Sequence, residues 1–400
     1  MSSCGEALSA AANIPTASLR TLNMANGDDK VASYSNIYSC ISNSTHCGWM
    51  DDNGNIVHEE HAVAKLHMKN YLHINMMPYD KARAQSLGFN NDIQISESNN
   101  ANDVFDQSSS SSVSRVMTAE QTNNNNVDGL SDGVVNSTIF YSLQAKTLYP
   151  WADYYTKQIY MEYVVPYAVT NEPRSDHRPL LFNALRETLK DYERKSKNDS
   201  GVSKQQLISP EKQVKEVVKL INTRLWSILG RPSQPIVFKA GLTPRIYDPL
   251  SVIAYGYSSC TGLAILLVAA LRAVGIPSRM AGTPAWYGDA DKGNHSWVEV
   301  YVPSDNGTGG KWVFLEPTPG IAEGDEDTAN ADDLDRDPCK RWFCNKDRFN
   351  GSTKVFATRY TKDDTTTHYP MAWSDPDKDD GVPGEDRTDY YTNICGQCPH

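Results

Sequence analysis

The chain has 400 residues, of which 39% are hydrophobic, and its formal net charge at pH 7 is −11. This length allows one large domain or two of ordinary size, and the negative charge argues against nucleic acid or an anionic membrane surface as the main partner. No apolar run reaches the roughly 18–20 residues that span a bilayer, and the N-terminus lacks the basic segment and apolar core of a signal peptide.

The first half of the chain is predicted to be mostly helical. Residues 1–57 carry few periodic signals, and we leave this N-terminal extension unassigned. Within a helical region over residues 58–230, apolar spacing predicts helices at residues 61–75, 136–148, 157–165 and 180–195 and a helix that opens at Ser209-Pro210. Residues 92–135 are polar and include runs of Ser and Asn, which predicts a disordered insertion.

The stretch YGYSSCTGLAILLVAALRAVGIP, residues 255–277, predicts a helix that is buried on nearly all sides. Every residue from Leu263 to Ala270 is aliphatic, the paired serines before Cys260 are good N-cap residues, and the sequence GIP ends the helix. Cys260 therefore lies at or near the first helical position. Helix-start amides and the helix dipole stabilise an anion there, which favours a reactive thiolate. The alternative is an inert buried thiol.

After Pro277 the apolar period changes from 3.6 to 2, which indicates strands. Candidate strands cover residues 279–281, 295–302, 311–316, 355–360 and 367–373. The turn sequence SDNGTGG joins the second and third of these into an antiparallel hairpin. Residues 320–337 are predicted to be an acidic loop, and residues 338–400 to add strands and, from Ser374, an acidic tail that completes the same domain. The fold class is α+β.

The hairpin also brings chemically useful residues onto one face. We expect a register in which His295 lies opposite Glu316, with Cβ atoms about 4.5–5.5 Å apart. The pairs further along the hairpin are then Trp297 with Phe314 and Glu299 with Trp312. Glu316 would accept a hydrogen bond from one imidazole nitrogen and leave the other nitrogen to face Cys260. A nucleophile, a base and a residue that orients the base form the pattern used in thiol acyl transfer. The alternative is a histidine that is merely packed.

Three blocks of this region resemble the transglutaminase-like superfamily, whose members share a papain-like catalytic core. The blocks are SSCTGLAILLVAALRAVGIPSRMAGTPAW, GNHSWVEVYV and KWVFLEPTP, and they resemble most the subgroup with GTPxW and GNHxWVEV motifs. The resemblance implies a catalytic core over residues 231–319, with a nucleophile-bearing helix packed on an antiparallel sheet. It also implies the triad Cys260, His295 and Glu316, although better-known members have Asp at the third place.

The resemblance implies a thioester formed with a peptide or protein amide. An amine resolves it by acyl transfer, and water resolves it by deamidation or proteolysis. Trp286 is a candidate wall of the acyl groove or else a packed aromatic residue, and Tyr255 and Tyr257 are candidate groove residues near the oxyanion site. Two alternatives stay open: a papain-like peptidase, and a catalytically silent relative that binds peptide or polysaccharide.

Cysteine spacing suggests disulfides and an oxidising compartment, so secretion is suspected, although connectivity cannot be inferred from sequence. The disulfide candidates fall into three close pairs: Cys40 and Cys47, Cys339 and Cys344, and Cys395 and Cys398. These pairs lack the repeated spacing of a zinc site, and residues 375–381 (DPDKDDG) lack the spacing of a calcium loop. We therefore expect no metal and no cofactor, and the oligomeric state stays open.

Overall fold

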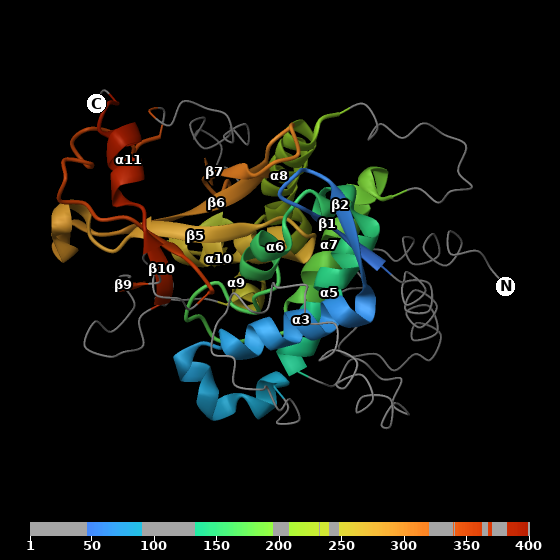
Figure 1. Ribbon diagram of the computed structural model, residues 1–400. Coiled ribbons are helices and arrows are strands. Elements are labelled where there is room, and N and C mark those ends of the chain that lie inside the picture. Colours follow the sequence, from blue (N-terminus) through green and yellow to red (C-terminus); the bar gives the residue numbers. More distant parts are fainter. Residues whose placement is uncertain are drawn as a thin grey trace.

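The computed structural model describes residues 46–89, 133–194, 208–231, 233–239, 248–319, 339, 341–361, 367–369 and 382–398. The expected Cys40, the acidic loop 320–337 and the calcium-like segment 375–381 lie outside these residues, as does most of the polar segment 92–135. In Figure 1 the C-terminal strand and helix of residues 382–395, in red, lie toward the left, and the green helices of residues 133–148 and 178–189 lie toward the right. None of the described helices is long and apolar enough to cross a membrane.

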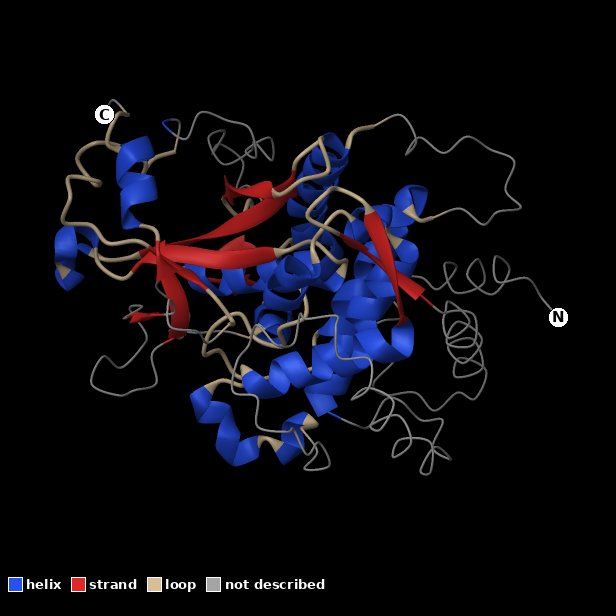
Figure 2. Cartoon of the chain, viewed as in Figure 1, coloured by secondary structure: helices blue, strands red, loops and turns tan. Residues whose placement is uncertain are grey.

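A six-stranded antiparallel sheet forms the centre of the fold (Figure 2), and the α+β class is confirmed. The strand order is β7-β6-β5-β8-β10-β9. The strands are β5 (Ser278–Thr283), β6 (His295–Pro303), β7 (Gly310–Leu315), β8 (Phe356–Thr358), β9 (Thr367–Tyr369) and β10 (Val382–Asp386). Strands from both sides of the acidic segment 320–337 thus belong to one sheet.

Helix α10 (Cys260–Ala273) lies between this sheet and the other helices. Every residue from Thr261 to Ala273 is buried, because the helix is apolar on all sides and finds contacts all around. It contacts β5 and β6, and on its other sides α5 (Gly133–Leu148), α7 (Arg178–Leu189), α8 (Pro210–Leu229) and α9 (Pro249–Tyr255). Gly275 ends the helix with φ +83°, and an added Cβ would meet Ala145 and Ala152 at 3.1 Å.

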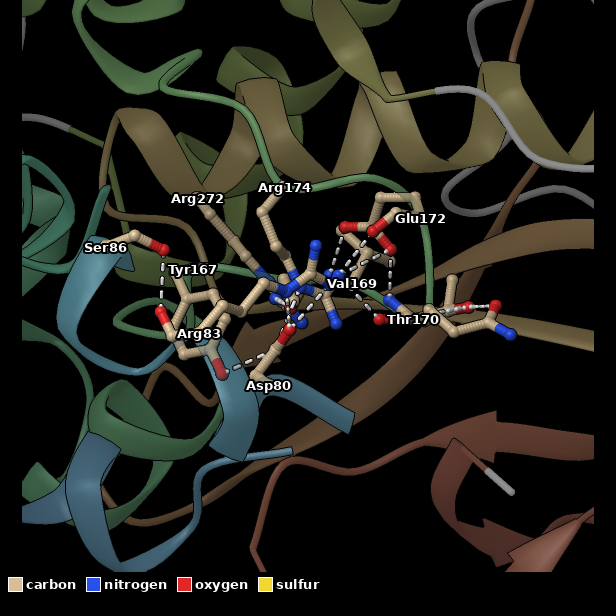
Figure 3. A network of polar contacts seen from close by, with 11 residues as sticks. Asp80, Arg83, Ser86, Tyr167, Val169, Thr170, Glu172, Arg174 and Arg272 are labelled. Atoms are coloured by element: carbon tan, nitrogen blue, oxygen red, sulfur yellow. Dashed lines mark hydrogen bonds and ion pairs between the residues drawn. The ribbon is translucent and has the colours of Figure 1, made fainter. Parts of the chain in front are cut away.

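Polar contacts fix the C-terminal end of α10 to the loop that follows α6 (Lys157–Tyr163), as Figure 3 shows. Arg272 donates to the carbonyl of Ala168 in that loop at 2.8 Å and to the carbonyl of Ser278 in β5 at 2.9 Å. The loop is itself braced by Glu172, whose carboxylate accepts the backbone N–H groups of Val169 and Thr170. Nearby, buried Asp80 accepts hydrogen bonds from Arg83, Tyr167 and Arg174. These bonds satisfy groups that would otherwise be costly to bury.

The helical region follows the expected pattern with shifted ends. Helix α3 covers His61–Ile74, and Ser209 is the extended residue before Pro210 at the start of α8. Helix α5 begins at Gly133, inside the end of the segment expected to be disordered, so that expectation is wrong for residues 133–135. Helix α7 ends at Leu189 and a 3-10 turn follows, so the predicted helix end at residue 195 is too late.

The N-terminal extension contains structure that the sequence analysis leaves unassigned. Strands β1 (His46–Met50) and β2 (Ile56–Glu60) form an antiparallel hairpin. The buried Lys146 ammonium of α5 holds it by donating to the Gly48 carbonyl at 2.6 Å and lying 3.9 Å from the Trp49 ring. Short strands without strict alternation give little signal on their own, and this hairpin depends on contacts with α5.

The C-terminal segment is also more ordered than predicted. The sequence predicts an acidic loop from Ser374 onward, but residues 382–386 form β10, between β8 and β9, and helix α11 (Thr388–Cys395) follows. The sequence VPGED is a poor strand signal. It is retained because Glu385 pairs with the buried Arg279 guanidinium of β5 at 2.9 Å, so a tertiary ion pair overrides local propensity.

Two disulfides tie α11 to the segment around residue 344. They join Cys339 to Cys398 and Cys344 to Cys395, so they link the two close pairs to each other instead of closing each pair. Cys47 does not fit the prediction: it is a buried free thiol, and burial raises its pKa to about 12. Cys40, its expected partner, lies outside the described residues.

We predict that Cys344→Ala combined with Cys395→Ala lowers the free energy of unfolding by about 2–3 kcal/mol. The bridge from Cys339 to Cys398 still closes the long loop, so the lost bridge constrains only the short ring between the two disulfides in the unfolded chain. Replacing both residues together avoids a new pairing with Cys398, whose sulfur lies 4.0 Å from that of Cys344. Thermal melting should show the loss, with Cys47→Ala as a matched control that keeps both bridges. Equal melting temperatures for the double variant and the wild type would contradict this prediction.

Candidate active site

The hairpin of β6 and β7 has a different register from the expected one. Val298 pairs with Leu315 and Glu299 with Phe314, so His295 does not lie directly opposite Glu316. The turn is longer than that register requires: residues 304–309 lie between the last paired residues, and the Ser304 N–H donates to the Gly309 carbonyl. A shift by two residues preserves the face of each side chain. His295 and Glu316 therefore meet diagonally, and His295 Nε2 lies 2.7 Å from Glu316 Oε1.

Cys260 is the first residue of α10, and the extended residue Ser259 precedes it. Its side chain is partly exposed. The groups that act most strongly on its thiol are the His295 side chain and the Ser296 backbone N–H. Thr261 and Ser296 place their hydroxyl oxygens 3.2 Å apart, which joins the start of the helix to the start of β6. The structure thus brings the three predicted residues of the triad together.

The charges of this site support one another. Burial alone would raise the pKa of the Cys260 thiol, but the hydrogen bond and charge of His295, with smaller contributions from Ser296 and Thr261, hold it below its ordinary value. Burial alone would lower the pKa of His295, but the Glu316 carboxylate and Cys260 raise it to about 10. Both shifts favour a thiolate paired with an imidazolium, the state in which a cysteine acts as a nucleophile.

Asn222, on the buried face of α8, positions the backbone that carries Glu316. Its amide nitrogen donates to the Glu316 carbonyl at 2.9 Å, and its amide oxygen accepts the Thr318 N–H at 3.2 Å. The side chain is fully buried. Sequence reasoning missed this residue, although a polar residue on the apolar face of an amphipathic helix was the signal that could have found it.

Aromatic side chains surround His295. The ring centroids of Phe343, Trp342 and Trp297 lie 4.9, 5.1 and 5.8 Å from the imidazole. Trp297 is fully buried and donates to the Tyr391 hydroxyl of α11 at 2.8 Å. Neither Trp342 nor Phe343 is a predicted site residue, because no sequence pattern links the segment after residue 338 to His295.

Trp286 is 2% exposed and packs against Trp342, Phe343 and Phe349. This burial favours the packed alternative over a wall of the acyl groove. The strand β5 that precedes it ends at Thr283, and after it the indole packs into a hydrophobic cluster that also contains Trp297 and Tyr391.

A family model described as the transglutaminase-like superfamily matches residues 205–317. This part of the chain belongs to the transglutaminase-like superfamily. The match contains Cys260, His295 and Glu316 and begins before the predicted core of residues 231–319, so it takes in α8 and Asn222. No curated protein and no solved structure matches the chain. The narrower subgroup with GTPxW and GNHxWVEV motifs stays a prediction.

The two tyrosines named from the sequence lie just before Cys260, the predicted nucleophile. Tyr255, at the end of α9, is 54% exposed, and Tyr257 begins the short strand β4 (Tyr257–Ser258). Their ring centroids are 6.0 Å apart. Strand β4 pairs in parallel with β3 (Val237–Phe238), which holds the chain as it enters α10. Their position keeps both tyrosines as candidate groove residues.

Metal ligands are not gathered at this site. Across the residues that the structure describes, no three His, Cys, Asp or Glu side chains form a group that could hold a metal ion. Glu316 itself uses one oxygen for His295, and its other oxygen is buried without a hydrogen-bond partner in the described structure.

We predict that Glu316→Gln lowers turnover by about 10²–10⁴-fold, because removing the carboxylate charge lowers the pKa of His295 and weakens the ion pair. The pKa of Cys260 then rises, so alkylation of the thiol by iodoacetamide should begin at a higher pH than in the wild type. Glu316→Asp keeps the charge and should lie between the two. An unchanged onset in Glu316→Gln would contradict the role given to this residue.

We also predict that Asn222→Ala shifts the onset of Cys260 alkylation in the same direction, because the end of β7 loses its support. The free energy of unfolding should fall by about 1–3 kcal/mol, the usual effect of losing a buried hydrogen-bond partner. Thr223→Ala, at an exposed neighbouring position of α8, is the matched control. A loss of stability without any shift in the onset would mean that Asn222 serves the fold alone.

Proposed function

We propose that this protein is a transglutaminase-like cysteine enzyme that forms a thioester with a peptide or protein amide. The observation that carries the proposal is the contact between His295 and Glu316 at 2.7 Å, with Cys260 at a helix start interacting with the same imidazole. The family assignment of residues 205–317 supports the reaction class without naming the substrate.

In the first half of the reaction, the Cys260 thiolate attacks the carbonyl carbon of the amide. A C–S bond forms and the carbonyl oxygen becomes an oxyanion. Amides in the first turn of a helix have no acceptor within that helix, so the Cys260 N–H is placed to donate to this oxyanion. The C–N bond then breaks, and the imidazolium of His295 gives its proton to the departing nitrogen.

In the second half, an amine or water attacks the thioester carbon while neutral His295 accepts the proton of the attacking group. The C–S bond breaks and the thiolate is restored. An amine gives acyl transfer, and water gives deamidation or proteolysis. The Glu316 carboxylate stabilises the imidazolium each time it forms.

The first test is the pH dependence of Cys260 alkylation by iodoacetamide, read by peptide mass in the wild type and in His295→Ala. We predict fast wild-type labelling that begins well below pH 8.5, the ordinary range of a free thiol. In His295→Ala the effect of burial is no longer opposed, so the onset should move to about pH 8.5 or above. At pH 6 this corresponds to a loss of about 100-fold in the labelling rate.

Cys47 provides an internal control for this experiment. It is a free thiol in the same chain, but it is buried and its pKa is raised, so it should stay unlabelled in the folded protein. Slow labelling of Cys260 with an ordinary thiol profile in both proteins would overturn the enzyme proposal and favour the silent binding protein.

A second assay separates the two reactions. A glutamine-containing protein is incubated with a fluorescent primary amine, and incorporation of the amine is compared with release of ammonia and with new peptide ends. Incorporation indicates acyl transfer, ammonia alone indicates deamidation, and new ends indicate proteolysis. Cys260→Ser should lack all three.

A further inference from the structure

Trp342 is the most exposed large apolar side chain in the described part of the chain, at 56%. Its ring centroid nevertheless lies only 5.1 Å from that of His295. Phe343, the next residue, is buried against the same imidazole at 4.9 Å. One indole therefore both contacts the proposed general base and presents more than half of its surface to the outside.

This indole is held in place from several sides. The guanidinium of Arg348 lies 4.8 Å from the ring centre of Trp342 and 4.9 Å from that of the buried Trp286. The two indoles contact each other with centroids 6.1 Å apart. The disulfide from Cys344 to Cys395 anchors the same segment to α11. An exposed aromatic ring that is already ordered loses little entropy when it binds a ligand.

We infer that Trp342 is a specificity-determining residue that stacks on an aromatic side chain next to the reacting amide of the acyl donor. The inference rests on the proposed function, because it concerns the same site. A carbonyl carbon that reaches the Cys260 sulfur lies beside the His295 ring, so the adjoining residue of the donor passes the exposed indole. Aromatic pairs are favoured there beyond their simple burial of apolar surface.

Charge also affects which residue is preferred next to the reacting amide. The Arg348 guanidinium places a positive charge against Trp342. A donor with Lys or Arg at the position next to the amide meets this like charge and is disfavoured. The expected order of donors is therefore aromatic, then small and neutral, then cationic.

The test uses three short peptides that carry a chloroacetamide in place of the reacting amide and differ only in the adjacent residue, Phe, Ala or Lys. Thiolate attack displaces chloride, and the second-order rate of labelling at Cys260 is read by mass. The wild type should label about 3- to 10-fold faster with the Phe peptide than with the Ala peptide, and most slowly with the Lys peptide. Trp342→Ala should lose the Phe-to-Ala ratio, and Trp342→Phe should keep most of it.

Tyr287→Asn is the matched control. Tyr287 is exposed and lies beside Trp286, and Asn tolerates its positive φ of 61°, so this variant should keep the ratio. Equal rates for the Phe and Ala peptides in the wild type, or an unchanged ratio in Trp342→Ala, would overturn the inference while leaving the nucleophile in place. Absence of labelling by any peptide would overturn the proposed function and the inference together.

Discussion

The burial of α10 is the constraint on which the rest of the structure depends. A helix that is aliphatic on every side is stable only when a sheet and several helices surround it, and here β5, β6 and four helices do so. Its first residue then necessarily lies at the edge of the core, beside the start of β6. The position of Cys260 against His295 follows from this packing. The hydrogen bond between the Thr261 and Ser296 hydroxyls also joins the start of α10 to the start of β6.

Placing a thiol at the edge of an apolar core has an electrostatic consequence. A thiolate there loses hydration and is unfavourable unless a positive charge lies beside it. Burial likewise disfavours the charged imidazolium form of His295. Glu316 offsets both burial costs, because its carboxylate stabilises the imidazolium, which in turn stabilises the thiolate. In the proposed triad, each charge thus stabilises the neighbouring opposite charge. Asn222 of α8 holds the backbone of Glu316 through its hydrogen bond to the Glu316 carbonyl.

Much of this arrangement could be predicted because its signals are local. The aliphatic run before GIP, the serines before Cys260 and the alternation in HSWVEVYV each report one element, and strand parity alone places His295 and Glu316 on one face. The predicted register of the hairpin between β6 and β7 was wrong by two residues, because the register depends on the length of the turn after Pro303. The sheet position of β10 and the contacts of Trp342 depend on partners far away in the sequence, which periodicity cannot report.

The C-terminal segment supports the site through β6 itself. Glu299, in the middle of that strand, is buried and pairs with Arg279 at 2.7 Å and Arg387 at 3.1 Å, and it accepts the Tyr391 hydroxyl. Removing one partner of such a buried ion pair costs about 3–5 kcal/mol. Tyr391 also accepts the indole N–H of Trp297, which packs against His295. The strand that begins with the proposed general base is therefore held by α11 on the same face as His295, so the segment after residue 338 is a structural part of the proposed active site.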